Sequence, residues 1–434
     1  MSRDDTGTPG ASTQADDTVG PGDGAGEPPQ GGRTRRRSNG RIGAAAVVAA
    51  LAGTVVGAVA MAGVQDAGSR PATPPTVAPA PPTSALADPP QPAVLLAWTP
   101  GTLDPGLADA AETDPGVTAV SRVRGGVVDL VASRDASGVP VDAPAAGWAI
   151  PLDAVAIDPE AHAELASVAE RAEVSGLGDG RALLGATSAE LRGLEPGSVL
   201  DLARGGSVVV AGVVSDSAVG GAELVVDLTT GERIGVATER YLLASYTGDR
   251  AALEQRLRAG LTGGSPVRFR GPGETPVLRN GDAVLPQVTI KDRFGEFAYR
   301  RGSDDEIDQD PGWQAENLET VDLPIIGTAR CHRDVVDALA GALDELEAAN
   351  LAGLVDPDGF AGCWNPRTTR GGTSLSRHAW GVAIDLNFGD NPTGLASVQD
   401  PRLVAVFARW GFTDGSSWLV PDAGHFEYVG PPRP

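Results

Sequence analysis

The chain has 434 residues, of which 41% are hydrophobic and 21% are charged, and its formal net charge is -23 at pH 7. This length allows one or two sizeable cores once polar segments are set aside. The negative charge argues against a nucleic-acid partner, because a phosphate polymer repels such a chain unless a basic patch stands apart from the rest.

Residues 1–41 are predicted to form a disordered tail. They are rich in Gly, Pro, Ser, Thr and Asp and contain almost no large apolar side chains. Such a segment buries too little surface to offset the entropy lost on ordering. An arginine cluster closes the tail, and it consists of Arg33, Arg35, Arg36, Arg37 and Arg41.

An uncharged run over 42–64 follows the arginines and predicts a transmembrane helix. As a helix this run would span roughly 34 Å, and the hydrocarbon core of a bilayer is about 30 Å thick. The positive-inside rule places the tail in the cytoplasm and the rest of the chain outside the cell membrane, which the chain would cross once. A signal peptide cleaved near Ala58-Val59-Ala60 is the alternative to this uncleaved anchor.

A linker and a mixed domain are expected next. Pro, Ala and Thr dominate much of 65–92, which predicts a semi-extended spacer. Residues 93–282 combine strand-like runs with helical patterns, which favours an extracytoplasmic α+β domain. We expect strands at 94–98, 127–131, 207–214 and 224–228, and helices at 159–172 and 250–261.

Part of this middle region resembles a known type of domain. The stretch from Ala182 through the Pro196-Gly197 turn to Val214 is similar to the extracytoplasmic domain of certain transporter permeases. The role of this domain stays open, and a membrane-protein partner that binds through 93–282 is one expectation for it. The alternative is a simple turn between a helix and a pair of strands. His162 lies in the helical pattern and is expected at the surface.

A separate C-terminal domain is expected over 324–434, with a connecting segment over 283–323 before it. Apolar residues spaced three and four apart predict a helix with one buried face. These residues are Val335, Val336, Leu339, Leu343 and Leu346. A second helix is expected from Pro401 to Trp410, because Asp400 precedes it as an N-cap and Gly411 follows its end.

The chain has two cysteines, Cys331 and Cys363. Both lie outside the membrane in the predicted topology, where disulfides persist. A bridge between them would close a loop of about 30 residues and contribute on the order of 3 kcal/mol to stability. Two free thiols or zinc ligation are the alternatives. His332 is expected to be exposed beside Cys331.

Two stretches near the end of the chain predict a zinc site. The first runs from Ser376 to Asp385 and contains His378, and the second is Asp422-Ala423-Gly424-His425. A catalytic zinc ion takes three protein ligands of imidazole nitrogen or carboxylate oxygen, so that a fourth position can hold water. His378, Asp385 and His425 supply that count. Alternating apolar residues over 382–386 predict a strand with Asp385 on the face opposite to them.

The pattern Ser-x-His-x-x-Gly-x-Ala-x-Asp, followed downstream by Asp-x-x-His, resembles the signature of the VanY-like zinc peptidases of the cell wall. That family contains D-alanyl-D-alanine carboxypeptidases and L-alanyl-D-glutamate endopeptidases. The resemblance implies an α+β domain with a small antiparallel sheet and packed helices. It implies that His378, Asp385 and His425 bind Zn²⁺, and that Asp422, three residues before the last histidine, is the catalytic base.

The same resemblance implies further roles. The family carries an arginine upstream of its first histidine that stabilises the oxyanion, which here is Arg367 with Arg370 in reserve. Ser376 is assigned to the substrate or to the groups behind the ligands. If 425–429 is a strand, Glu427 shares a face with His425. Glu427 would then orient this ligand or act as the base in place of Asp422.

Function follows from this resemblance together with the predicted location. The chain is expected to be a membrane-anchored zinc peptidase that acts on peptidoglycan stem peptides, most simply as a D-alanyl-D-alanine carboxypeptidase. Cleavage between L-alanine and D-glutamate is the first alternative. A non-catalytic wall-binding or scaffolding protein and a peptidase of ordinary proteins are two others. Trp380 and Trp418 would either line the cleft or belong to the core.

Overall fold

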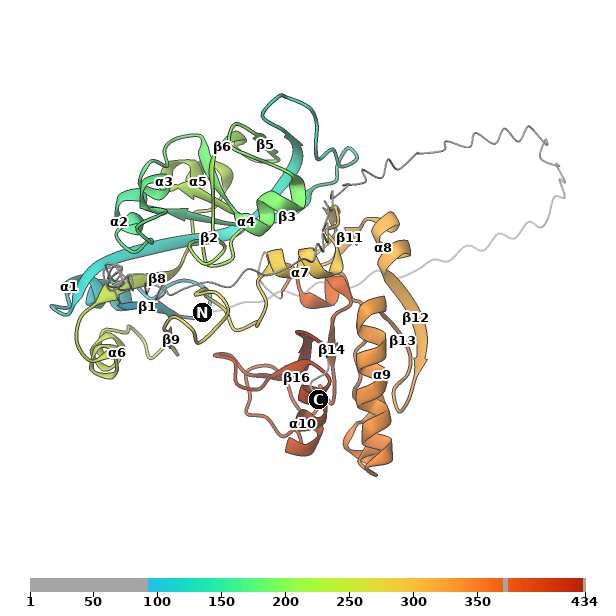
Figure 1. The fold of residues 1–434 in the computed structure, drawn as a ribbon. Coiled ribbons are helices and arrows are strands. Elements are labelled where there is room, and N and C mark those ends of the chain that lie inside the picture. The colour runs from blue at the N-terminus through green and yellow to red at the C-terminus, as the bar shows by residue number, and fades with distance from the viewer. Residues whose placement is uncertain (1–92, 370–373, 432–434) are drawn as a thin grey trace, which may run out of the picture. The chain divides into compact units, whose positions relative to one another are not determined.

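The described part of the chain comprises residues 93–369 and 374–431 of a computed structural model, shown as a ribbon in Figure 1. All of these residues belong to one compact unit of the chain. The predicted tail, membrane helix and linker over 1–92 lie outside the described residues, as does Arg370. Within 93–369 and 374–431, none of the helices combines the length and the apolar character that a membrane crossing requires.

The first half of the described chain forms a mixed nine-stranded sheet with surrounding helices. Its strands are β1 (Ala93–Trp98), β2 (Val117–Arg134), β3 (Ile150–Ile157), β4 (Arg181–Gly185), β5 (Val199–Leu202), β6 (Gly206–Val214), β7 (Leu224–Asp227), β8 (Glu239–Tyr246) and β9 (Arg268–Arg270). Its helices are α1 (Pro105–Thr113), α2 (Pro159–Ala163), α3 (Arg171–Ser175), α4 (Ala186–Arg192), α5 (Leu228–Ile234) and α6 (Arg250–Ala259).

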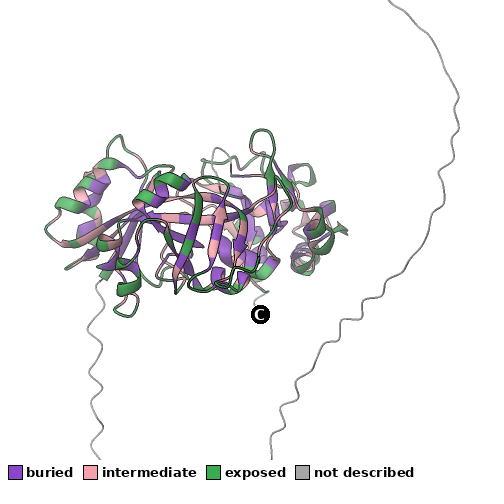
Figure 2. Cartoon of the chain, turned by 90° about the horizontal axis from the view of Figure 1, so that it is seen from above, coloured by how far each residue is buried: buried purple, intermediate pink, exposed green. Residues whose placement is uncertain are grey.

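Six of these strands close into a hydrogen-bonded ring. The neighbours run β2-β3-β7-β4-β6-β5 and return to β2, whose 18 residues are long enough to pair also with β8. Alternate residues of each ring strand point into one shared core, as a strand period of two requires. Buried examples from four of the strands are Leu130, Leu152, Leu200 and Val226. Figure 2 shows buried residues gathered along the inner strands, with exposed residues on the helices and loops around them.

The predicted strands of the middle region are confirmed, and one predicted helix is wrong. The expected helix over 159–172 is broken into α2 and α3, and the side chain of Arg171 donates from Nε to the carbonyl oxygen of Ala163 at 3.1 Å. That contact satisfies a carbonyl at the end of α2 that a continuous helix would have paired internally. The predicted helix at 250–261 is present as α6, with Asp249 as its N-cap.

The second half of the described chain contains helices and three small antiparallel sheets. Its helices are α7 (Gln287–Phe294), α8 (Pro311–Asn317), α9 (Arg333–Ala348) and α10 (Pro401–Arg409), with short 3₁₀ turns η1 (Ala352–Leu354), η2 (Pro357–Gly359) and η3 (Arg377–Trp380). Its strands are β10 (Tyr299–Arg301), β11 (Ile307–Gln309), β12 (Leu318–Leu323), β13 (Gly327–His332), β14 (Ala383–Asp385), β15 (Phe412–Gly415) and β16 (Asp422–Tyr428). The expected α+β class with small antiparallel sheets is therefore confirmed.

One hydrophobic core extends through this second half. It contains residues of the segment expected to be a connection, such as Phe294 and Trp313, together with Leu339 of α9 and Phe426 of β16. The amphipathic pattern that predicts α9 is confirmed, because its apolar residues at spacings of three and four face this core. The caps predicted for α10 are confirmed too, since the Asp400 side chain accepts from the backbone N–H of Arg402 and Gly411, with a φ of +88°, follows the C-cap residue Trp410.

The predicted disulfide is present. Cys331, in β13, is bonded to Cys363 with a Cα–Cα distance of 4.9 Å and a sequence separation of 32 residues. Both cysteines are fully buried in the core of the second half. The bridge therefore fixes the segment that leads into the predicted zinc motif against the strand that precedes α9.

Candidate metal centre

Three short elements bring His378, Asp385 and His425 together. His378 lies in η3, Asp385 is the last residue of β14, and His425 lies in β16. β14 and β16 pair antiparallel with Asp385 directly opposite His425. Gly381 ends η3 with a φ of +69°, and a Cβ at this position would lie 2.9 Å from the backbone nitrogen of His332. Glycine is therefore required at this close approach.

The ligand atoms of the three residues converge on one point. His378 Nε2 lies 3.3 Å from Asp385 Oδ1 and 3.3 Å from His425 Nδ1, and His425 Nδ1 lies 3.0 Å from Asp385 Oδ1. Both imidazoles are buried, whereas the Asp385 side chain is 24% exposed. The cluster therefore has two enclosed nitrogen donors and one carboxylate that solvent can reach.

The outward-facing nitrogen of each imidazole has its own acceptor. His378 Nδ1 lies 3.2 Å from the carbonyl oxygens of both Gly362 and Cys363, so this nitrogen donates and Nε2 keeps its lone pair for the cluster. His425 Nε2 lies 3.4 Å from Glu427 Oε1, so Nδ1 keeps its lone pair in the same way. Metal-binding histidines are normally held by such carbonyl or carboxylate acceptors. The donor set therefore fits a divalent zinc ion.

The electrostatics of the cluster also favour a cation. Burial by itself would lower the pKa of His425, but hydrogen bonds to Asp385 and Glu427 outweigh burial and raise this pKa to about 9. Burial would raise the pKa of Asp385, but hydrogen bonds with His378 and His425 hold it well below its ordinary value. Without a metal, a proton on His425 satisfies the facing lone pairs, and a bound metal would displace that proton.

Asp422 and Ser376 precede His425 and His378 in the sequence by three and two residues, respectively. Asp422 is the first residue of β16, and its Oδ1 accepts from Thr393 Oγ1 at 3.0 Å. Ser376 is the N-cap of η3, and its Oγ accepts from the backbone N–H of His378 at 3.3 Å. Ser376 therefore supports the turn that carries a ligand. The contact from Thr393 had no recognisable signal in the sequence, because Thr393 lies in a loop without periodicity.

Arg367 is tied to the same turn through its backbone. Its carbonyl oxygen accepts from the backbone N–H of Ser376 at 3.0 Å, and its backbone forms a bridge with Glu306. The side chain of Arg367 is half-buried. Its predicted contact with an oxyanion stays a prediction.

Glu427 lies behind His425, on the side of the imidazole away from Asp385 and His378. Its side chain is buried, and its Oε1 contacts the outward-facing Nε2. Burial alone would raise the pKa of Glu427, but the hydrogen bond with His425 and nearby Arg377 lower it. Because the imidazole separates this carboxylate from the convergent ligand atoms, the geometry favours an orienting role for Glu427 over that of base.

The two tryptophans weighed from the sequence have different surroundings. Trp380 is fully buried and donates from Nε1 to the carbonyl oxygen of Gly295 at 3.1 Å, so it belongs to the core. Trp418 lies in the loop before β16, and its ring centroid is 5.3 Å from that of His425. Of these two tryptophans, Trp418 therefore borders the cluster of His378, Asp385 and His425, which is called the metal cluster below.

Two histidines expected at the surface are buried, so both expectations are wrong. His332 is the N-cap of α9, where its Nδ1 accepts from the backbone N–H of Asp334. His162 contacts Ser121 Oγ through Nδ1 at 2.9 Å, and burial lowers its pKa to about 4. Neither belongs to the cluster of His378, Asp385 and His425.

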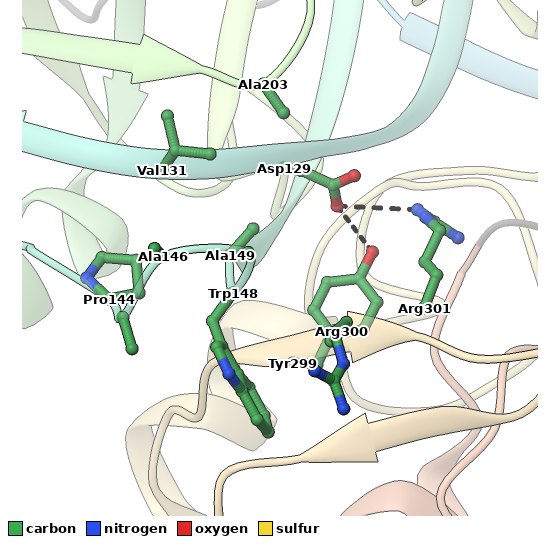
Figure 3. Close-up of a pocket in the computed structure, with 12 residues that line it drawn as sticks. Asp129, Val131, Pro144, Ala146, Trp148, Ala149, Ala203, Tyr299, Arg300 and Arg301 are labelled. Carbon is green, nitrogen blue, oxygen red and sulfur yellow. Dashed lines mark hydrogen bonds and ion pairs between the residues drawn. The ribbon is translucent and has the colours of Figure 1, made fainter.

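A cavity of about 400 Å³ lies away from these residues, between β2, the loop before β3 and β10 (Figure 3). Tyr299 donates from its hydroxyl to Asp129 Oδ1 at 2.5 Å, and Arg301 forms an ion pair with the same carboxylate at 3.5 Å. Trp148 lines the cavity beside Arg300, whose guanidinium lies 5.5 Å from the centroid of the tryptophan ring. The cavity shares no lining residue with the metal cluster.

Comparison with known families supports the predicted resemblance. Residues 369–428 match the family model described as D-alanyl-D-alanine carboxypeptidase. The matched region contains His378, Asp385, Asp422 and His425, and Arg367 lies just before it. The resemblance of the C-terminal region to this peptidase family is therefore confirmed, and it indicates a peptidase. No curated protein gives a significant match to the chain.

Two solved structures show distant similarity. The periplasmic region of MacB from Actinobacillus actinomycetemcomitans is 11% identical, with a TM-score of 0.29, over 41% of this chain and 88% of that one. The extracellular domain of the noncanonic ABC-type transporter YknZ from Gram-positive bacteria is 12% identical, with a TM-score of 0.26, over 41% of this chain and 98% of that one. Because both scores are low, the predicted resemblance of the middle region to permease domains stays a prediction.

Proposed function

We propose that this chain is a zinc peptidase that hydrolyses peptidoglycan stem peptides, acting as a D-alanyl-D-alanine carboxypeptidase. The observation that carries the proposal is the convergence of His378 Nε2, Asp385 Oδ1 and His425 Nδ1, with the outer nitrogen of each imidazole bonded to an acceptor. The family match over 369–428 supports the substrate class.

His378, Asp385 and His425 would hold the zinc ion. When bound, zinc lowers the pKa of a coordinated water to about 7 and polarises the scissile carbonyl. Glu427 keeps the His425 ring in the orientation that presents Nδ1. Gly362 and Cys363 do the same for His378 through their carbonyl oxygens.

Asp422 is the proposed general base and acid. Thr393 donates to Oδ1, which orients the carboxylate. Oδ2 has no hydrogen-bond partner among the described residues, and it would accept a proton from the attacking water. The same oxygen would then hold this proton and deliver it to the departing amine nitrogen. A carboxylate in this role typically contributes about 10²–10⁴-fold to the rate.

Arg367 is the proposed donor to the oxyanion of the tetrahedral intermediate. A guanidinium presents charge-assisted N–H groups to a developing negative charge, and such contacts are among the strongest electrostatic contributions to acyl transfer. Ser376 supports His378 at the start of η3.

We also propose that residues 42–64 anchor the chain in the cell membrane, with the peptidase region outside, and that 93–282 recruits a membrane-protein partner. The arginine cluster before the apolar run supports this orientation. It would bring the site to the cell wall, where stem peptides are found.

Product analysis tests the proposed activity. The zinc-loaded chain is incubated with purified muropeptides, with His378→Ala and Asp422→Ala as controls, and the products are identified by mass spectrometry. Release of one terminal alanine from pentapeptide stems, absent in both variants, would support the carboxypeptidase. Cleavage between L-alanine and D-glutamate would support the endopeptidase instead, and hydrolysis of ordinary L-peptides would indicate a general peptidase. Stoichiometric zinc without any product would support the non-catalytic alternative.

A further inference from the structure

The loop over 416–421 joins β15 to β16 and borders the metal cluster. It carries Trp418, whose ring centroid lies 5.3 Å from that of His425. The loop leads directly into Asp422, the first residue of β16. Any shift of this loop would therefore move both the aromatic wall of the cluster and the proposed base.

Two side chains of the middle region, Asp282 and Arg268, hold this loop on both sides of Trp418. The backbone N–H of Leu419 donates to Asp282 Oδ2 at 2.6 Å. Arg268, in β9, donates from Nη2 to the carbonyl oxygen of Ser417 at 2.6 Å. The residues immediately before and after Trp418 are thus both anchored through their backbones.

The two anchoring side chains also bind each other. Asp282 Oδ1 pairs with Arg268 Nη1 at 3.0 Å and with Arg270 Nη2 at 2.9 Å. The Asp282 side chain is only 9% exposed, so its contacts are screened little by solvent. Arg270 in turn lies 4.7 Å from the centroid of the Trp98 ring in β1. The anchor is therefore built into the nine-stranded sheet.

Leu419 adds an apolar contact to the polar ones. Its partly buried side chain packs, as that of Leu278 does, against a hydrophobic cluster that belongs mainly to the first sheet and includes Trp98. The loop is therefore attached to the middle region by two hydrogen bonds to its backbone and by one partly buried side chain. None of these partners lies within the matched residues 369–428.

We propose that Asp282 and Arg268 are positioning residues of the peptidase site, which they serve by fixing the Trp418 loop against His425 and setting the entry of the chain into Asp422. The proposal rests on the proposed peptidase function for its effect on rate. It gives the middle region a specific task, which is to complete a site whose ligands all come from the C-terminal region. A misplacement of about 1 Å at a catalytic group can cost on the order of 10²-fold in rate.

The first test compares three variants of the full chain. Asp282→Ala removes the acceptor for Leu419 and the partner of Arg268, whereas Asp282→Asn keeps an acceptor oxygen. Asp114→Ala is the matched control: Asp114 is 5% exposed, pairs with Arg256 at 2.6 Å and accepts from the backbone N–H of Gly116, far along the chain from the loop.

We expect Asp282→Ala to lower kcat on muropeptides by about 10²-fold, with KM little changed and zinc stoichiometry retained. Asp282→Asn should recover much of this loss, and Asp114→Ala should retain the wild-type kcat. Equal kcat values for Asp282→Ala and Asp114→Ala would overturn the proposal.

Hydrogen exchange gives a readout that needs no substrate. The Leu419 amide should exchange about tenfold faster or more in Asp282→Ala than in the wild type, because its acceptor is lost. The same amide should be unaffected in Asp114→Ala. An unchanged exchange rate at Leu419 in Asp282→Ala would also reject the proposal that Asp282 positions the Trp418 loop.

Quenching by Co²⁺ separates this proposal from the proposed function. Co²⁺ bound by His378, Asp385 and His425 should quench Trp418 fluorescence, isolated by difference from Trp418→Phe, and Asp282→Ala should weaken the quenching. If the wild type binds Co²⁺ but hydrolyses no stem peptide, the proposed function fails. The quenching and exchange results would still show whether Asp282 positions the Trp418 loop. If Asp282→Ala leaves the quenching and the exchange unchanged, the positioning role of Asp282 is rejected, whatever the activity of the variant.

Discussion

Two buried clusters of ionisable side chains differ in the source of their positive charge. In the metal cluster, Asp385 contacts the imidazoles of His378 and His425, and within the described residues it forms no ion pair with a lysine or an arginine. The lone pairs of two nitrogens and one carboxylate oxygen therefore converge without a permanent cation from the chain.

The second cluster lies where α7 meets the first sheet, and it is neutralised internally. Lys291 of α7 lies 2.7 Å from Glu223 and 2.9 Å from Glu296, and Arg192 of α4 pairs with both carboxylates. Lys291, Glu223 and Arg192 are almost completely buried. Glu223 and Glu296 thus both face two cations that the chain itself supplies, and Arg192 lies in addition 3.9 Å from Asp142.

The comparison teaches how to separate a binding site from a structural network. Both clusters are buried, and both contain carboxylates that would be costly to leave unpaired. Only the metal cluster lacks a lysine or arginine partner, so only there does an external cation improve the electrostatics. The second cluster instead attaches α7 to the sheet, and an added metal would meet two positive side chains.

The largest expected effect breaks the metal cluster itself. His425→Ala removes one of three convergent donors, so we expect loss of stoichiometric zinc together with loss of muropeptide hydrolysis. Zinc content is measured by mass spectrometry of the purified, folded variant. His332→Asn is the control, because it removes a buried imidazole outside the cluster and keeps an N-cap acceptor for α9. Full zinc content in His425→Ala would contradict the assignment.

Lys291→Met tests the second cluster. It leaves Glu223 and Glu296 without one of their two cations, so we expect a loss of about 3–5 kcal/mol in the free energy of unfolding. Urea denaturation measures this loss, and the folded variant should still bind zinc. Adding Glu223→Gln to Lys291→Met should recover part of the stability. A loss below about 1 kcal/mol would show that this buried network stabilises the fold no more than an exposed ion pair does.

Glu427→Gln is expected to weaken the metal cluster without removing a ligand. Glutamine keeps the shape of the side chain but removes the negative charge of the carboxylate that contacts His425 Nε2. Replacement of such supporting groups typically costs about 10–100-fold in metal affinity. Competition with a chromogenic chelator measures the change. An unchanged affinity would show that Glu427 has no part in orienting the ligand.

The smallest expected effect concerns pH and contrasts two buried histidines. Burial holds the pKa of His162 at about 4, below the value of about 6.5 in the unfolded chain. The unfolded state then binds more protons as the pH falls below 6.5, so stability should fall by about 1 kcal/mol between pH 6.5 and 5.5. Denaturation curves at these two pH values measure the loss, and His162→Gln should reduce it.

His425 should act in the opposite direction in zinc-free protein. Its pKa in the folded state is raised to about 9, so its stabilising contribution is complete below pH 6.5 and is lost as the pH rises through 9. Zinc should remove this loss, because the bound metal takes the place of the proton. An identical decline in zinc-free and zinc-loaded protein between pH 6.5 and 9 would count against the cluster.

The sequence by itself determined the local features of the C-terminal region. The spacing of small residues, histidines and acids from Ser376 to His425 identified three side chains that converge in the structure, and it identified the resemblance to the peptidase family. Periodicity identified α9, and cap residues identified α10. These predictions succeeded because helix periods, caps and motif spacings are short-range properties that neighbouring residues set.

Only the tertiary structure decided which distant groups contact the His378 imidazole and the loop that carries Trp418. The carbonyl oxygens of Gly362 and Cys363 have no side-chain signal, and the contact of Asp282 with Leu419 joins residues 137 apart in the chain. The burial of His162 likewise depends on packing against Ser121 in β2. Such contacts depend on how sheets and loops pack against one another, and local patterns in the sequence do not predict that packing.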